Sequence, residues 1–470
     1  MPGGGRGSLS KRSTPGRDAQ RAKQAHGSPN GSRAIAPIYK RLPHGPHRLE
    51  RDEVVRHQRA RIHGAMIEAV ALGGYERTSV KQVIGLAGVS RRSFYEQFPN
   101  RQECFLATFD LLATRGIRAM AESHLATDGD FAERLDAGFR AACAKIEQAP
   151  KAASLVLAEA QTAGGAGTLR VHRSLTACEP LLARAFASSP DAVCPPAPIV
   201  RAITGGLHGA LAHAVRARDP VAGAAGLAEQ LTAWTILFAV RPAETEELLA
   251  TRLRTRMRQI SLASAHRDGE TGASDDERTQ ILQEALRLAA LYDYRELSAP
   301  QIADGACVSI DAFLELFATR EECYLAALDM VSEKLLEVLA DVERSGAEWS
   351  SAVRIAMAGL LSCLGEHPAY ARAVAQSAFA AGSVPAARAQ ELLEAIAARL
   401  IARAPATPGA GLALQGIAGA LLHTIRAQVV DGRPQLLGAL SDHLAYVVLV
   451  PFLGADAAHE ALSPPAPAVR

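Results

Sequence analysis

Apolar residues recur three and four positions apart over most of the chain, which is the spacing of one buried helix face. No segment shows the sustained alternation of apolar and polar residues that is typical of a β-strand. Glycine and proline interrupt the helical pattern at intervals, for example at 73–74 and 219–220. The pattern therefore predicts an all-α protein built from many helices.

Two short helices joined by a tight turn form the clearest local pattern. The Thr-Ser pair at 78–79 can cap the first helix, and Gly88 can end it because glycine adopts positive φ without steric cost. Ser90 can cap the second helix, in which Phe94 and Phe98 fall on one buried face. This spacing predicts a helix-turn-helix.

Polar side chains lie away from the apolar face of the second helix, where they could enter a DNA major groove. These side chains are Arg91, Arg92, Ser93, Tyr95 and Gln97. Arginine suits such a position because its guanidinium can donate two hydrogen bonds to a guanine edge. Two alternatives stay open: the hairpin could be purely structural, and Tyr95 could simply pack beside Phe94.

The stretch resembles the head of the TetR (tetracycline-repressor-like) family. The resemblance rests on the Thr-Ser cap at 78–79, the Ala-Gly-Val-Ser turn at 87–90, the Phe-Tyr-Glu-Gln-Phe run at 94–98 and the Asn-Arg-Gln-Glu run at 100–103. It implies that the two arginines after the turn contact base edges, while neighbouring residues hold phosphates. The predicted DNA-contacting residues are Thr78, Ser79, Lys81, Ser90, Arg91, Arg92, Ser93, Tyr95, Gln97 and Arg101.

The same head pattern occurs a second time. Residues 71–110 match residues 290–329 at 17 of 40 positions without a gap. The shared positions are largely those that build the fold: the caps, the turn and the buried aromatic residues. The similarity returns in the later helices, where the Ile-Thr-Gly-Gly-Leu run at 203–207 resembles Ile-Ala-Gly-Ala-Leu at 417–421. The sequence therefore predicts two TetR-like units in tandem.

The second head lacks the polar face of the first. Its corresponding residues are Ile310, Asp311, Ala312, Leu314 and Leu316. Residues 56–110 hold eight basic and five acidic residues, a net charge of +3, whereas residues 275–329 hold four and twelve, a net charge of −8. Because DNA affinity depends strongly on neutralising phosphates, we expect the second head to be a structural or interaction module. The alternative is an acidic head that still binds DNA with altered specificity.

Charge and composition divide the chain further. Residues 1–48 hold ten basic residues and one acid and are rich in Gly, Pro and Ser, which predicts a disordered basic tail. This tail could lie along DNA or serve only as a solubilising extension. A helix at 242–260, acidic at its start and arginine-rich at its end, is interpreted as a solvated connector rather than an extra DNA contact.

The predicted domains follow in this order. They are a basic tail at 1–48, a DNA-binding head at 49–110, a helical effector-binding and dimerisation domain at 111–263, a linker at 264–274, an acidic degenerate head at 275–329, a second such helical domain at 330–462 and a disordered tail at 463–470.

No catalytic or metal-binding motif stands out. The chain has no phosphate-binding loop, no zinc-protease motif and no dinucleotide fingerprint, and its seven cysteines form no Cys-x-x-Cys pair. His208 and His213 are five residues apart, which does not place them squarely on one helix face. With His423 they are interpreted as pocket-lining or core residues, and we expect no enzyme activity, cofactor or metal.

The longest apolar runs, such as 445–453, are too short to span a bilayer, so no membrane partner is expected. The absence of a signal-peptide pattern at the N-terminus predicts a protein of the bacterial cytoplasm, associated with the nucleoid when bound to DNA.

The resemblance implies a transcriptional regulator that binds double-stranded DNA, and more specifically a repressor released by a small apolar effector. A helical interaction scaffold, or an effector-binding protein without specific DNA binding, is the alternative. Family members are expected to pair their last two large helices with a partner subunit. Because this chain holds two copies, at 199–240 and 412–453, it could form either an intramolecular pseudo-dimer or a homodimer.

Overall fold

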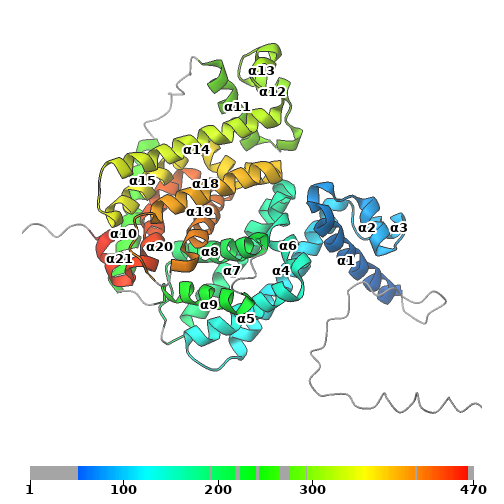
Figure 1. Cartoon of the computed structure of the whole chain (residues 1–470), viewed down its shortest axis with the longest axis horizontal. Coiled ribbons are helices and arrows are strands. Elements are labelled where there is room, and N and C mark those ends of the chain that lie inside the picture. The colour runs from blue at the N-terminus through cyan, green and yellow to red at the C-terminus, as the bar shows by residue number, and fades with distance from the viewer. Residues whose placement is uncertain are drawn as a thin grey trace, which may run out of the picture.

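The computed structural model describes residues 51–190, 192–217, 223–239, 243–264, 276–292, 294–407 and 410–463. Within these ranges every regular element is a helix, which confirms the all-α prediction (Figure 1). The predicted basic tail at 1–48 and most of the predicted linker at 264–274 lie outside the described residues, as does nearly all of the predicted C-terminal tail.

The first half of the chain runs from the first head to a long connecting helix. Its elements are α1 (Arg51–Arg77), α2 (Val80–Ala87), α3 (Arg91–Tyr95), α4 (Arg101–Ala126), α5 (Phe131–Gln148), α6 (Pro150–Leu157), η1 (Glu159–Thr162), α7 (Gly164–Ala187), α8 (Ala197–Ala217), α9 (Gly223–Ile236) and α10 (Ala243–Ser264). Gly74 has a φ of 77° and breaks the long first helix where the glycine pair predicted its end.

The described residues of the second half also form only helices. Its elements are α11 (Glu277–Leu291), η2 (Tyr294–Glu296), α12 (Ala299–Gly305), α13 (Ile310–Leu316), α14 (Arg320–Arg344), α15 (Trp349–Glu366), α16 (Pro368–Arg372), η3 (Ala373–Ser377, a turn of π-helix), α17 (Ala378–Ala381), α18 (Ser383–Ile401), η4 (Ala410–Leu412), α19 (Ala413–Val430), η5 (Pro434–Leu440), α20 (Ser441–Leu453) and α21 (Ala455–Leu462).

The two halves meet most extensively along α8 and α19, the helices that carry the similar runs at 203–207 and 417–421. Glycines let the two backbones touch: a Cβ added at Gly205 would lie 2.6 Å from the carbonyl oxygen of Gly419. The indole of Trp234 packs at the same crossing, 3.0 Å from where a Cβ of Gly416 would lie. The predicted close approach of these helices therefore takes place within one chain.

The first head has a hydrophobic cluster of its own. Residues of α1 to α4 pack there with Leu155, Ala160 and Val171 from α6, η1 and α7. The second head instead belongs to the large cluster that also contains α5, α8, α9 and the rest of the second half. Figure 1 shows the two heads on different sides of the molecule. The first head is thus attached to the body as a separate packing unit.

The connecting helix α10 does not stand free in solvent as predicted. Its Arg252 and Arg256 both bind the buried carboxylate of Asp442 in α20, with N–O distances of 3.1 and 2.9 Å. Arg252 also donates to the carbonyl of Leu462, and Thr245 is hydrogen-bonded to His459 at 3.0 Å. The helix therefore ties the first half to the last helices of the second.

One segment exceeds the apolar length predicted from the sequence. Pro434–Leu453, which comprises η5 and α20, has 20 residues with a mean hydropathy of 1.7, long and apolar enough to cross a membrane. In the folded chain 83% of its most apolar window is buried. A helix with this composition is also typical of a protein core, and here it packs against α15, α19 and α10.

Candidate nucleic-acid interface

The helix-turn-helix of the first head is fixed by the predicted caps. Ser79 Oγ accepts from the backbone N–H of Gln82 at 3.2 Å, while the Gln82 side chain accepts from the Ser79 N–H at 2.8 Å. Gly88 ends α2 in the left-handed conformation, with a φ of 60°. Ser90 Oγ then accepts from the Ser93 N–H at 3.0 Å and begins α3. These local predictions are confirmed.

Aromatic packing determines which side of α3 faces outward. Phe94 and Phe98 are buried, with ring centroids 5.9 Å apart. The guanidinium of Arg59 stacks on Phe98 at 4.7 Å, and Arg61 donates to the Gly88 carbonyl at 2.8 Å. The sequence pattern did not predict that either arginine supports the turn. A signal existed for Arg59, because Arg278 stacks on Phe317 at the equivalent position of the second head.

The outward side of the motif carries three exposed cations, Lys81, Arg91 and Arg92. Among the described residues, no hydrogen-bonding or ion-pairing partner engages Lys81 or Arg91. Arg92 pairs with Glu96 at 2.9 Å, yet its side chain stays 88% exposed. An exposed pair of this kind contributes little to stability, so Arg92 can exchange Glu96 for a ligand at low cost.

Tyr95 and Ser93 lie beside these cations. Tyr95 is 47% exposed and meets the Phe94 ring edge to face, with centroids 5.4 Å apart. Tyr95 therefore packs against Phe94 while part of its side chain remains accessible to a ligand. Ser93 is half-buried, and its hydroxyl is hydrogen-bonded to that of Ser90 at 2.8 Å. The serines at 79 and 90 act as helix caps, so their side-chain oxygens are already in use.

Three predicted contacts are engaged in the fold, and this corrects the predicted set. Thr78 is buried and its hydroxyl donates to the Gly74 carbonyl at 2.9 Å. Arg101 stacks on the Tyr75 ring at 4.5 Å and donates to the Thr78 carbonyl. Gln97 is half-buried, with its side-chain oxygen enclosed in the protein. Thr78 and Arg101 therefore hold the head together instead of extending from its outer face. The enclosed oxygen of Gln97 has no hydrogen-bonding partner among the described residues.

The second head has the same construction with a different surface. Ser309 Oγ accepts from the Ala312 N–H at 3.0 Å, and Arg320 stacks on Tyr294 at 5.1 Å as Arg101 does on Tyr75. The outward residues include Ile310, Leu314 and Leu316, all exposed. No cation stands on α13, so this face offers no group that could neutralise a phosphate.

The first head is joined to both halves of the body at the end of α1. The Glu76 carboxylate accepts from the backbone N–H of Ser383 at 3.1 Å, at the start of α18. A negative charge is favourable at that helix end. The neighbouring Tyr75 N–H donates to Glu159 of η1 at 2.9 Å. Any change in the relative position of η1 and α18 therefore acts on the base of this head.

The histidines at 208, 213 and 423 were interpreted from the sequence as pocket-lining or core residues, and two of them line a cavity. His208 of α8 lies near His423 of α19, and both line one cavity between the two halves. His423 bonds Glu179 at 3.1 Å. Burial lowers the pKa of His208 to about 3, helped by nearby cations including Arg426, and burial also lowers the pKa of His423. Both rings are therefore neutral at physiological pH.

Comparison with known families bears on the first head. Residues 65–108 match the sequence model of the bacterial regulatory proteins, tetR family. In sequence, the first head is therefore similar to the heads of the tetR family. The match supports a DNA-binding transcriptional regulator, and it points to a regulatory family rather than an enzyme family.

Two other comparisons do not indicate a function. A solved structure described as the fatty acid degradation regulator FadR from Bacillus halodurans is similar at 16% identity and a TM-score of 0.34, covering 37% of this chain and 96% of that one. This likeness is too weak to bear on function. No curated protein matches the chain.

Proposed function

We propose that the chain is a tetR-like transcriptional regulator that binds double-stranded DNA through the first head, with Arg91 and Arg92 at base edges. The observation that carries this proposal is the exposure of both arginines at the start of a helix capped by Ser90. Arginine at such a position can donate two hydrogen bonds to a guanine edge. Lys81, Ser93 and Tyr95 lie on the same side and would contact phosphates or neighbouring bases.

The second head is proposed to be a module that retained its fold without retaining DNA binding. Supporting this are the net charge of −8 over residues 275–329 and the apolar residues Ile310, Leu314 and Leu316 on the exposed side. A protein without cations on this helix gains none of the counterion release that drives association with DNA.

The chain is further proposed to consist of two tetR-like units that pair within one molecule, with the predicted domain boundaries. The packing of α8 against α19 supports this arrangement, because it joins the corresponding helices of the two halves. Such a pseudo-dimer would present one DNA-binding head, and would recognise an asymmetric site. A homodimer of chains is the alternative that a measurement of mass must exclude.

We propose that the protein represses transcription and that binding of a small effector relieves this repression. The contacts of Glu76 with α18 and of Tyr75 with η1 give a physical route from the body to the head. An effector that favours one relative position of these elements shifts the population of head orientations, and can lower the affinity for DNA. A protein acting in this way works in the cytoplasm.

The experiment is a mobility-shift assay with fragments of the DNA upstream of the protein's own gene. We expect the double variant Arg91→Ala/Arg92→Ala to lose specific binding, since each lost base contact should cost about 1–3 kcal/mol. Helix content and thermal melting should stay nearly unchanged, because both side chains are exposed.

The matched control is Ile310→Ala/Asp311→Ala, which changes the equivalent positions of the second head and should leave binding intact. Wild-type affinity in the arginine variant would show that α3 does not read DNA. A complete absence of specific binding by the wild-type chain to any selected sequence would favour the interaction scaffold.

A further inference from the structure

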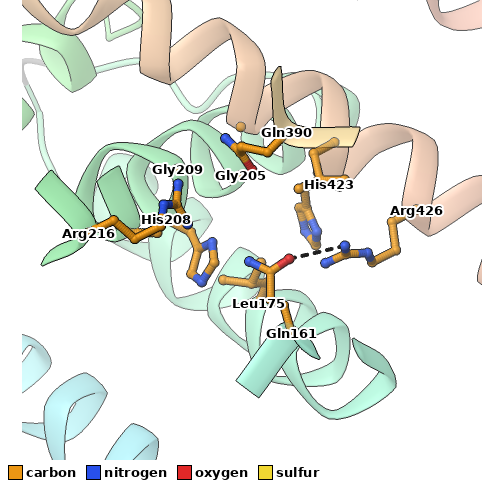
Figure 2. Close-up of a pocket in the computed structure, with 12 residues that line it drawn as sticks. Gln161, Leu175, Gly205, His208, Gly209, Arg216, Gln390, His423 and Arg426 are labelled. Carbon is orange, nitrogen blue, oxygen red and sulfur yellow. Dashed lines mark hydrogen bonds between the residues drawn. The ribbon is translucent and has the colours of Figure 1, made fainter. Parts of the chain in front are cut away.

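A cavity lies between the two halves of the body, bounded by α7, α8, α18 and α19 (Figure 2). Its polar lining comes from both halves: Gln161, His208 and Arg216 from the first, and Gln390, His423 and Arg426 from the second. The cavity is small, with a volume of about 20 Å³, and it is partly open to solvent. Among the described residues that line it, the charged side chains are the two arginines.

Arg426 is the most unusual of these residues. Its side chain is 1% exposed, and it stacks on the Phe379 ring at 4.8 Å. Its Nε donates to the Ala375 carbonyl at 2.6 Å and an Nη donates to the Gln161 amide oxygen at 3.2 Å, both uncharged acceptors. No carboxylate of the described residues pairs with it. Burial lowers its pKa to about 9, so the guanidinium is still charged at neutral pH.

A buried charge without a counter-charge is rare, because desolvation is costly unless an opposite charge offsets it. The nearby acids are already occupied. Glu179 accepts from Arg201 at 3.0 Å and is hydrogen-bonded to His423. Glu394 of α18 lies close enough to influence Arg216, and it accepts a hydrogen bond from Gln390. Glu394 therefore partly offsets the charge of Arg216, whereas Arg426 has no carboxylate partner among the described residues.

One further feature suggests that the space is built for an occupant. The carbonyl that positions Arg426 belongs to Ala375 in the π-helical turn η3. Such turns are uncommon and are found frequently at functional sites.

We infer that this cavity binds a small oxyanion, a carboxylate or a phosphate group, between the two halves of the chain. Arg426 supplies the buried charge and a planar set of donors suited to such a group. Arg216, exposed at the rim, supplies the second charge, and Gln390 a neutral donor. An anionic group differs from the apolar effector expected from the sequence.

The inferred site is connected to the first head. Gln390 stands on α18, the helix whose first residue donates to Glu76. An influence of the anion on DNA binding rests on the proposed function. Anion binding itself does not, and the following experiment contains no DNA, so the two can fail separately.

The test is thermal melting of the full chain at pH 7.5 with sodium phosphate or sodium acetate, each compared with sodium chloride at equal ionic strength. A ligand that binds the native state raises the melting temperature in a saturable way. We expect a rise of several degrees with at least one oxyanion and none beyond the salt effect with chloride. A response to phosphate alone identifies a phosphate site, and a response to acetate alone identifies a carboxylate site.

Two variants and a control locate the effect. Arg426→Gln and Arg216→Gln should each remove the rise in melting temperature caused by the oxyanion. If Arg426→Gln does not fold, Arg216→Gln alone tests the inference. The control Arg388→Gln removes an exposed cation of α18 that pairs with Asp329 outside the cavity, and should keep the shift. The inference is overturned if neither oxyanion exceeds chloride, or if Arg216→Gln melts with the full wild-type response.

Discussion

Cys307 occupies a backbone position that favours glycine. Its φ is 58°, and it is the one residue other than glycine with a positive φ among those the structure describes. The equivalent position in the first head is Gly88, with a φ of 60°. A side chain in this left-handed region costs about 1–2 kcal/mol, which the second head tolerates without the advantage of glycine.

We predict that Cys307→Gly stabilises the protein. Relief of the strained backbone is partly offset by the greater freedom of glycine in the unfolded chain, so the gain should be about 0.5–1 kcal/mol. Urea denaturation measures the change. The reverse substitution Gly88→Cys should destabilise by a similar amount, and a loss of stability in Cys307→Gly would contradict the strain.

At the residue scale the sequence predicted the caps and the buried aromatic residues well, because these depend on local spacing. For Arg101 the sequence suggested a phosphate contact, but in the structure its guanidinium stacks on the Tyr75 ring. The repeat held the necessary clue, since Arg320 preserves this residue in a head without a DNA-binding face. Thr78 gave no such signal, because Leu297 replaces it in the second head.

The crossing of α8 and α19 is the element-scale feature on which the body depends. A Cβ added at Gly419 would lie 2.4 Å from the Gly205 carbonyl oxygen and 3.0 Å from the Gly209 Cα. Because both obstacles are backbone atoms, neither can move without separating the helices.

We therefore predict that Gly419→Ala destabilises the chain by about 1–3 kcal/mol, the usual cost of overpacking. Chemical denaturation provides the measurement. The matched control is Gly116→Ala in α4, where an added Cβ meets nothing within 4 Å. Alanine there should stabilise by about 0.5–1 kcal/mol through its higher helix propensity. Equal effects of the two substitutions would mean that the helices do not meet closely.

Two features, the packing of α10 and the cavity around Arg426, could not be predicted from sequence patterns. The charge pattern of α10 predicted a solvated connector, because its counter-charge Asp442 is nearly 190 residues away in the chain. The sequence also did not predict the cavity around Arg426, since its lining comes from η1, α7, α8, α18 and α19, which belong to both halves. Pairings over such distances depend on how the halves pack, which local periodicity does not specify.

At the scale of the whole molecule, both halves contribute helices to one body, but their heads differ in surface charge and in packing. Helix α8 of the first half packs against α19 of the second, and the exposed cations Lys81, Arg91 and Arg92 stand on the first head. The first head is its own packing unit, whereas the second shares the hydrophobic cluster of the body. We therefore propose that the first head binds DNA and that the second has an architectural role.

The most direct test is to determine the mass of the protein–DNA complex by analytical ultracentrifugation, together with footprinting of the same complex. One chain per DNA site and an asymmetric footprint are expected, because a single chain already pairs its own α8 and α19 and has one basic head. A stable dimer of chains that protects a perfect palindrome would contradict the intramolecular pseudo-dimer.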